Sequence, residues 1–439
     1  MHTVIDNNAA YSLCILWFAL LAVLFVDART KPSSGLTLIY AAQLSVLHLP
    51  GGMLLLVPWY EYYPRAWTFL GFQMTSFGLA AFVIGALVAR FVLPTPVISP
   101  RQPNPLAAKR LGVLLIAIGL GFTFLISQAN FLFQIPSLAA LLVAVWMLGA
   151  PGLCIYMQSF ILNDKKMPLH VYLIALGFPA FSIMFLGFLG FGITYLVFII
   201  CFGVSQKYFP KIIFAAAPAL VYVGISFFVN YIPQRSEIRD AVWGDQSLSV
   251  RADATSVIFT DFKWFDPDNF FHLKALDDRL NQNWLVGSAI ENLNSGRSEF
   301  LQGESLMFAL VAWVPRAIWI NKPGVAGSSN IVANLTGLTF SENTSVGVGH
   351  ILEFYGNFGY ISLYIGMFLT GLVLRSIDLM ASAHLMKNNL VMWIRWVIPG
   401  IALTNVGGTL SETVSGVAAF IILGYLLQFF TTRLSRGFD

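Results

Sequence analysis

The sequence predicts an all-α polytopic integral membrane protein of about eleven transmembrane helices, with a large extracytoplasmic loop containing short interfacial or re-entrant helices. Of its 439 residues, 57% are hydrophobic and only 10% are charged, whereas about 25% of residues are charged in an ordinary soluble domain. Apolar runs of roughly 17 to 25 residues recur along the chain, and each can cross a ~30 Å hydrocarbon layer as a helix. The small net charge of +4 gives no indication of a nucleic-acid partner.

Eleven apolar runs, bounded by charged residues, Pro or Gly, account for the predicted spans. They lie at 9–26, 36–57, 67–93, 111–129, 137–162, 169–187, 189–205, 212–231, 351–375, 391–410 and 412–432. The stretch 169–205 is too long for one span, and its glycines predict a hairpin at 185–192 because glycine adopts turn conformations that other residues avoid. The first run is interpreted as a retained helix, since no basic n-region precedes it.

The orientation follows from the distribution of Lys and Arg, which collect in cytoplasmic loops. One set of alternate loops, with the C-terminus, holds Arg29, Lys31, Arg90, Arg101, Lys109, Arg110, Lys165, Lys166, Lys207, Lys211, Arg375, Lys387, Arg433 and Arg436. The short loops of the other set hold only Arg65. The N-terminus and the large loop are therefore predicted to face outward. Aromatic residues at 58–67 fit an outer membrane interface.

Three regions are predicted: an N-terminal membrane bundle at 1–231, a large loop at 232–350 and C-terminal membrane helices at 351–439. The loop is polar and mildly acidic, and loops of this length are usually functional or disordered. Its Phe and Trp content argues against disorder. Within it, the apolar segment 305–320 is too short to span and is expected to be re-entrant or interfacial. FDPDN at 265–269 lacks the spaced ligands of a calcium loop, so no metal site is predicted.

The segment 349–366 carries the clearest candidate site. On a continuous helix, one face would hold the polar side chains His350, Glu353, Asn357, Tyr360 and Tyr364. A carboxylate and an imidazole that enter a membrane are functional candidates by default. The structural alternative is a helix end whose polar groups contact headgroups or bridge to other helices. The sequence favours a functional role for Glu353 and a structural one for His350.

Cations in the large loop form a second set of candidates. Arg316 lies beside Pro315 within the apolar segment 305–320, and Lys322 precedes a Pro-Gly turn, so both suit a phosphate or diphosphate near the membrane surface. Their structural alternative is snorkelling to lipid headgroups. Arg235, Arg239 and Arg251 follow the eighth run and could form a further basic rim or a solvated face. Glu412, at the start of the last span, could face the same region but is expected to cap that helix.

The stretch from about 310 to 375 resembles the O-antigen polymerase family, the Wzy-type oligosaccharide repeat-unit polymerases. The shared features are an Arg and a Lys-Pro in a late, large loop, here Arg316 and Lys322, and a following helix that begins Glu-x-Tyr-x-Asn-Phe-Gly, here 353–359. The motif covers about a seventh of the chain, and elsewhere the resemblance is one of architecture. The odd span count, with the N-terminus outside, departs from the even count common in such enzymes.

The resemblance implies an inverting glycosyltransferase that moves a glycan from undecaprenyl diphosphate to the next lipid-linked repeat unit, at the periplasmic face of a bacterial inner membrane. It implies Arg316 and then Lys322 as cations for the leaving diphosphate, with Glu353 as base and His350 in reserve. Asn357, Tyr355, Tyr360, Arg235 and Arg239 are expected to bind substrate. No cofactor is expected. Expected partners are membrane lipids, a chain-length regulator and a flippase.

Two alternatives remain open at this stage. A lipid-linked glycan ligase would use the same donor with another acceptor. A transporter or flippase of lipid-linked glycans would be favoured by charged or broken-helix sites near the bilayer midplane.

Overall fold

The computed structural model describes residues 7–92, 98–127, 138–209, 211–244, 246–314, 319, 328–340 and 346–436. Its secondary structure in these ranges is helical. The helices are α1 (Asn7–Thr30), α2 (Leu36–Leu54), α3 (Arg65–Val92), α4 (Pro105–Ile126), α5 (Leu138–Trp146), α6 (Gly149–Ile161), α7 (Leu169–Leu186), α8 (Leu189–Ser205), α9 (Lys211–Trp243), α10 (Leu248–Thr260), α11 (Phe270–Leu280), α12 (Asn283–Asn294), α13 (Glu304–Ala312), α14 (Ser328–Thr336), α15 (Gly349–Phe358), α16 (Tyr360–Met386), α17 (Leu390–Ala402) and α18 (Leu410–Arg436).

Helix length and hydropathy make the chain a multi-pass membrane protein. In the described part of the chain, eight helical segments are long and apolar enough to cross a membrane: Asn7–Thr30, Arg65–Val92, Pro105–Ile126, Leu141–Ile161, Leu169–Leu186, Ile212–Trp243, Tyr360–Met386 and Leu410–Phe430. The predicted runs at 189–205 and 391–410 form the shorter apolar helices α8 and α17. The run at 36–57 forms α2, which carries the polar side chains Gln43 and His48. Each of the eleven predicted runs thus contains a helix among the described residues, but only eight of them give long apolar spans.

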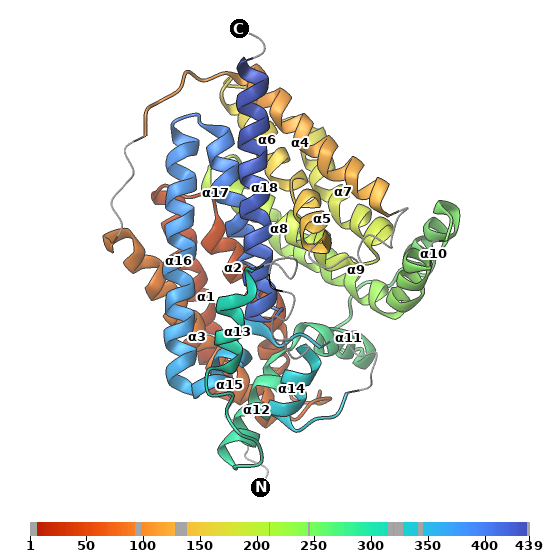
Figure 1. The fold of residues 1–439 in the computed structure, drawn as a ribbon. Coiled ribbons are helices and arrows are strands. Elements are labelled where there is room, and N and C mark those ends of the chain that lie inside the picture. The colour runs from red at the N-terminus through yellow and green to blue at the C-terminus, as the bar shows by residue number, and fades with distance from the viewer. Residues whose placement is uncertain are drawn as a thin grey trace.

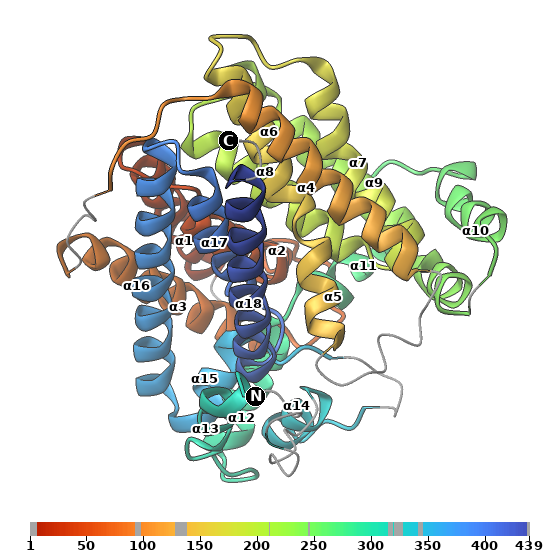
Figure 2. The ribbon, with the colours of Figure 1, turned by 45° about the horizontal axis from the view of Figure 1, so that its top comes forward.

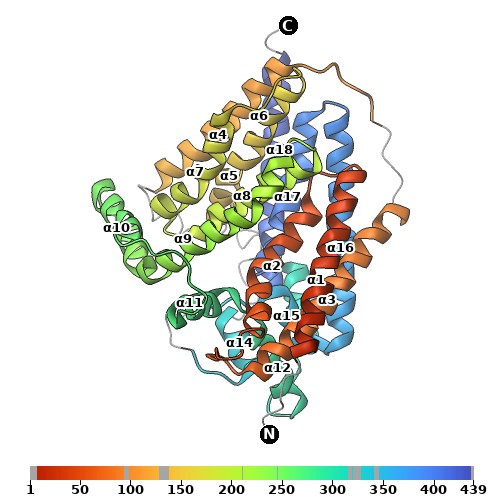
Figure 3. The ribbon, with the colours of Figure 1, turned by 180° about the vertical axis from the view of Figure 1, so that it is seen from behind.

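The membrane helices form two neighbouring groups (Figure 2). In one, α16 packs along α3 and against α17, while α1 and α2 pack on α3. In the other, α4 packs on α6, and α7 packs on α8 and α9. Helices α11 to α15 gather at one end of the membrane helices, and α18 runs from them to the opposite end (Figures 1 and 3). The end with α11 to α15 is the one that the sequence predicts to face outward.

Helices α3 and α16 touch through glycine. A Cβ atom on Gly85 would lie 2.0 Å from the carbonyl oxygen of Phe368, and one on Gly371 would lie 2.0 Å from that of Phe82. Small residues that let two backbones approach are typical of helix contacts in membranes, where apolar side chains gain little by leaving lipid. These two glycines therefore fix the distance between the two helices.

The predicted hairpin at 185–192 is confirmed. Helix α7 ends at Gly187, which has φ +75° and ψ +9°, and α8 begins two residues later at Leu189. This left-handed conformation is one that glycine adopts without a steric penalty. The glycine also lies close to α9, because a Cβ there would come within 3.5 Å of the Arg239 Cα.

The predicted span at 351–375 is wrong in its bounds. The chain turns at Gly359, with φ +67° and ψ −140°, so α15 is a separate short helix and the span α16 begins at Tyr360. The span then continues to Met386, which places Arg375 inside a membrane helix rather than in a loop. Similarly, α9 continues to Trp243, so Arg235 and Arg239 lie on its last turns.

Arg375 belongs to a buried network of charges that joins the three helices α1, α3 and α16 and the turn between α1 and α2. Its guanidinium contacts Asp378 at 2.5 Å and Asp27 at 2.9 Å, and Asp27 also pairs with Arg90 at 2.5 Å. The Asp378 carboxylate accepts hydrogen bonds from the Ser33 hydroxyl and the Ser34 backbone N–H, both at 2.7 Å. Each charge therefore has an opposite partner, which offsets much of the cost of burial.

We predict that Arg375→Met strongly destabilises the fold, because it leaves Asp378 buried without its cationic partner. Removing one member of a buried ion pair costs about 3–5 kcal/mol. The measurement is the midpoint of thermal unfolding of the purified protein in detergent. The control is Arg297→Met, since Arg297 pairs with Glu291 on the exposed surface, where ion pairs contribute about 1 kcal/mol or less. Equal midpoints for the two variants would contradict the structural role of the network.

Candidate functional site

Helix α15 carries the residues that the sequence singled out, and it is enclosed by other elements. It packs against α3, α12, α13, α16 and α18. Its first residue, Gly349, has φ +72°, and Gly359 follows its last residue, so both ends of the helix are set by glycine turns. Every residue from Gly349 to Asn357 is buried. The short helix therefore lies inside the assembly formed by loop helices and membrane helices.

Glu353 is fully buried on this helix. Its Oε2 accepts a hydrogen bond of 2.7 Å from the backbone N–H of Leu410, the first residue of α18. Its other oxygen, Oε1, is buried and has no hydrogen-bond partner among the described residues. An unpaired buried carboxylate oxygen is costly.

The electrostatic setting of Glu353 favours a carboxyl group that exchanges a proton near neutral pH. Burial raises the pKa of Glu353 to about 7, and nearby Glu412 acts in the same direction. The Leu410 N–H opposes this rise in pKa, and so does the hydroxyl of Ser305, which lies close to the carboxyl group but does not meet hydrogen-bond geometry with Oε1. A general base works best when its pKa lies near the operating pH.

A helix-capping role for Glu412 was predicted and is confirmed. The Thr409 backbone N–H donates to Glu412 Oε2, and the Glu412 backbone N–H donates to the Thr409 hydroxyl, both at 3.0 Å. This reciprocal pair is a capping box at the start of α18. The start of α18 therefore has two carboxylates beside it. Glu412 belongs to the capping box, and Glu353 accepts a further hydrogen bond from the Leu410 N–H.

His350 is held by hydrogen bonds from both sides. Its Nδ1 lies 3.0 Å from the Tyr40 hydroxyl on α2, and its Nε2 lies 3.3 Å from the Thr413 hydroxyl on α18. Burial lowers the pKa of His350 to about 4, so the ring is neutral at physiological pH. The imidazole thus links three helices, which agrees with the structural role that the sequence favours for it.

Three further candidates from the same motif differ in exposure. Asn357 is fully buried and uses its amide to bond Gly303, Ser305 and the Glu353 carbonyl oxygen. Tyr355 is also buried, and its hydroxyl donates to Asn294 at 3.3 Å. Tyr360, in contrast, is 42% exposed at the start of α16. The single polar stripe predicted through Tyr360 and Tyr364 is therefore interrupted at Gly359.

Arg316 and Lys322, the predicted cations, lie outside the described residues. The described chain reaches this segment from α13, which packs on both α15 and α18. The Leu301 N–H, just before α13, donates to the Gly356 carbonyl oxygen at 2.8 Å. The chain therefore runs beside the Glu353 helix shortly before it reaches Arg316.

Arg235 and Arg239 lie in a different part of the molecule, beside an apolar cavity of about 440 Å³. The cavity lies among α4, α5, α7, α8 and α9, and its walls include the rings of Trp146, Phe188, Phe191 and Trp243. The Arg235 guanidinium lies over the Phe188 ring at 5.8 Å, and that of Arg239 lies over the Trp243 ring at 4.9 Å.

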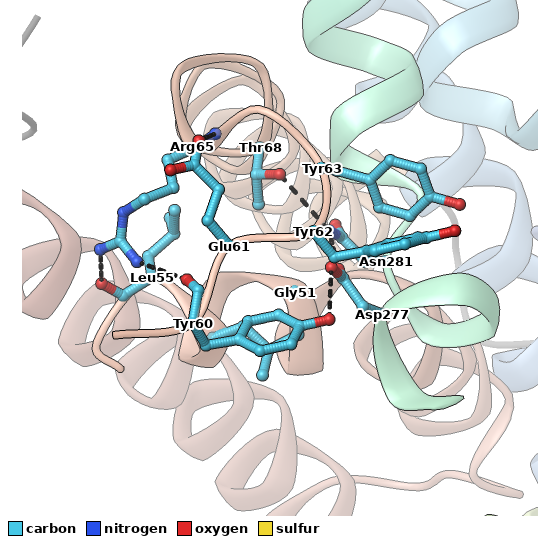
Figure 4. Close-up of a pocket in the computed structure, with 11 residues that line it drawn as sticks. Gly51, Leu55, Tyr60, Glu61, Tyr62, Tyr63, Arg65, Thr68, Asp277 and Asn281 are labelled. Carbon is cyan, nitrogen blue, oxygen red and sulfur yellow. Dashed lines mark hydrogen bonds between the residues drawn. The ribbon is translucent and has the colours of Figure 1, made fainter. Parts of the chain in front are cut away.

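A buried polar cluster that sequence reasoning missed joins the large loop to α2 and α3. Asp277 on α11 accepts hydrogen bonds from the Tyr60 hydroxyl at 3.0 Å and from the Asn281 amide at 2.6 Å. It lines a small pocket (Figure 4) with room for about one water molecule. Tyr60 was predicted at the membrane interface but is only 3% exposed. Only the tertiary contact with Asp277 shows that Tyr60 belongs to this buried cluster.

No protein-family model, curated protein or solved structure matches this chain. The candidate site is therefore argued from its own residues. The first candidate region is Glu353 on α15, whose carboxyl group contacts the start of α18. The second, at a separate place, is formed by the arginines beside the apolar cavity.

The pKa of Glu353 leads to a stability prediction. A raised pKa in the folded state means that the carboxyl group stabilises the fold fully below its usual pKa of 4.5 and that this contribution is lost as the pH rises through about 7. The loss amounts to about 3 kcal/mol. Glu353→Gln should remove this dependence, so that the variant unfolds at the same temperature as wild type, or higher, at pH 8. Unfolding midpoints from pH 4 to pH 8 measure the effect.

The opposite result has a distinct meaning. If Glu353→Gln unfolds at a lower temperature at every pH, the carboxylate acts as a second cap for α18 rather than as a strained acid–base group. Glu412→Gln serves as the matched control, because Glu412 lies at the same helix start but is exposed.

Proposed function

We propose that this chain is a membrane-embedded glycosyltransferase that polymerises polyprenyl-diphosphate-linked oligosaccharide repeat units into a surface polysaccharide. The observation that carries the proposal is the Glu353 carboxyl group, which is buried with one oxygen unpartnered among the described residues and has its pKa raised to about 7. Glu353 also opens the Glu-x-Tyr-x-Asn-Phe-Gly motif through which the chain resembles the O-antigen polymerases.

The proposed reaction forms one glycosidic bond and breaks one bond to phosphate. A hydroxyl of the acceptor repeat unit attacks the anomeric carbon of the donor glycan, and Glu353 accepts the hydroxyl proton. The bond from the anomeric carbon to the diphosphate oxygen breaks, and the lipid diphosphate leaves with the electron pair. Arg316 and Lys322 are assigned to the developing negative charge, since Arg can bind two phosphate oxygens at once.

The proposed topology places the reaction at the periplasmic face of a bacterial inner membrane. The N-terminus is periplasmic and the C-terminus cytoplasmic in this proposal, which rests on the distribution of Lys and Arg along the sequence. The gathering of α11 to α15 at one end of the membrane helices supports it, because α15, the helix that carries Glu353, then lies at the outer end (Figure 1). Substrates with lipid tails would reach that end within the membrane.

A transporter or flippase of lipid-linked glycans is the second candidate, and one observation favours it. Arg375 and Asp378 are buried inside the span α16, and charged residues within spans often mark transport pathways. Their ion pairs and the Ser33 and Ser34 contacts favour a static link between helices instead. A glycan ligase shares the proposed donor chemistry and differs only in its acceptor.

We predict that Glu353→Gln and Arg316→Ala each abolish polymerisation. Loss of a general base typically costs about 10²–10⁴-fold in rate, so long glycan chains should disappear while single repeat units persist. The measurement is the ladder of glycan lengths from a deletion strain that expresses each variant, with membrane abundance checked by immunoblot.

Glu412→Gln is the control, because it removes the neighbouring carboxylate but keeps Glu353. An unchanged ladder with Glu353→Gln would contradict the polymerase proposal. Accumulation of lipid-linked units on the cytoplasmic face would instead support the flippase, and Asp378→Asn should then reproduce it. Retained ladders that fail only to reach their final acceptor would indicate a ligase.

A further inference from the structure

The apolar cavity among α4, α5, α7, α8 and α9 lies beside a cluster of arginine side chains that differs chemically from its apolar walls. Its walls are mainly aromatic and aliphatic side chains. A volume of about 440 Å³ falls within the range of sites that hold small ligands. It is large enough for a segment of one hydrocarbon chain.

Two arginines beside this cavity carry buried nitrogen atoms without a partner among the described residues. Arg251 on α10 is 2% exposed, and its Nη1 is unpaired. Its Nε donates to the Gln246 carbonyl oxygen and its Nη2 to that of Ser127, which adjoins the cavity residue Ile126. The second unpaired atom is the Nε of Arg239. A buried guanidinium group with unpaired N–H donors is stabilised when it binds an anion.

The positive charge extends beyond these two residues. Arg235 lies one helical turn before Arg239, and Arg279 on α11 interacts electrostatically with Arg235. None of these arginines forms an ion pair with another described residue, and the described acidic neighbours Glu237 and Asp240 are exposed. Asp245 lies outside the described residues. Several unneutralised cations suit a group with more than one negative charge.

We infer that this cavity binds a single-chain lipid with a terminal phosphate or diphosphate, whose chain enters the cavity and whose head is bound by Arg239 and Arg251. One apolar chamber fits one chain, and the number of cations fits a terminal phosphate better than the singly charged phosphodiester of a two-chain phospholipid. The inference deepens the proposed function, since it gives a lipid-diphosphate substrate a site apart from Glu353. The binding itself does not require the reaction.

Contacts at the edge of the cavity place the proposed binding site for the lipid head next to that for the lipid chain. The Trp243 indole N–H donates to the Leu186 carbonyl oxygen at 3.3 Å, and Leu186, Phe188 and Trp243 all line the cavity. Arg239 lies over that same indole. A lipid head on Arg239 would therefore lie directly above the aromatic mouth that receives its chain.

Native mass spectrometry of the purified full-length protein with undecaprenyl phosphate tests the inference. Arg239→Gln and Arg251→Gln should each weaken binding about tenfold. Arg297→Gln, an exposed arginine of the same loop region, should leave it unchanged. Val143→Phe, which fills the cavity without removing charge, should also weaken it, and this variant keeps the test valid if an arginine variant fails to fold.

Competition separates the sources of phosphate. Phosphatidylglycerol or inorganic phosphate, added at the same concentration, should not displace the probe. Displacement by either one, or equal binding by all variants, would overturn the inference. Binding is measured without turnover, so it tests the cavity independently of the reaction. If the wild-type protein binds undecaprenyl phosphate but produces no ladder of glycan lengths in cells, the proposed function alone is rejected.

Discussion

The carboxylate of Asp378 is the contact on which the arrangement of the membrane helices depends. It binds Arg375 on its own helix and receives hydrogen bonds from Ser33 and Ser34 at the turn between α1 and α2. Ser34 also accepts a hydrogen bond from the Trp393 indole on α17. In a low-dielectric interior such groups persist when each charge has an opposite partner, as Asp378 has in Arg375. One buried carboxylate thus sets the positions of α1, α2, α16 and α17.

Glu353 differs from Asp378 in the way its burial is compensated. Asp378 has a cation at 2.5 Å and two hydrogen-bond donors. Glu353 has one backbone donor, one unpartnered oxygen among the described residues, and a second carboxylate, Glu412, nearby. The first arrangement gives a buried carboxylate an opposite charge and hydrogen-bond donors, whereas in the second burial raises the pKa of the carboxyl group to about 7. That contrast is the physical reason for treating Glu353 as functional and Asp378 as structural.

The positions of the two candidate regions suit a reaction between lipid-anchored substrates. The Glu353 region is formed by α13, α15 and the start of α18, while the arginine-rimmed cavity is formed by α4, α5 and α7 to α9. In the proposed function, the Glu353 region would accept the proton and the separate apolar cavity would bind the lipid chain. The glycan and the lipid chain would then be held by different forces, hydrogen bonding and the hydrophobic effect.

The sequence by itself determined the helical class, the places of the apolar runs, the Gly187 hairpin and the Glu412 cap, because each depends on local composition or on residues close along the chain. It also selected Glu353. Only the tertiary structure decided that Gly359 separates α15 from α16, that Arg375 is buried with Asp27 and Asp378, and that Tyr60 bonds Asp277. The Arg375–Asp27 and Tyr60–Asp277 contacts join residues more than two hundred positions apart, and the turn at Gly359 depends on the backbone conformation of one residue, so no local pattern encodes them. Burial and pairing of a charge are properties of its three-dimensional neighbours, so the sequence could name the candidates and the fold had to distinguish them.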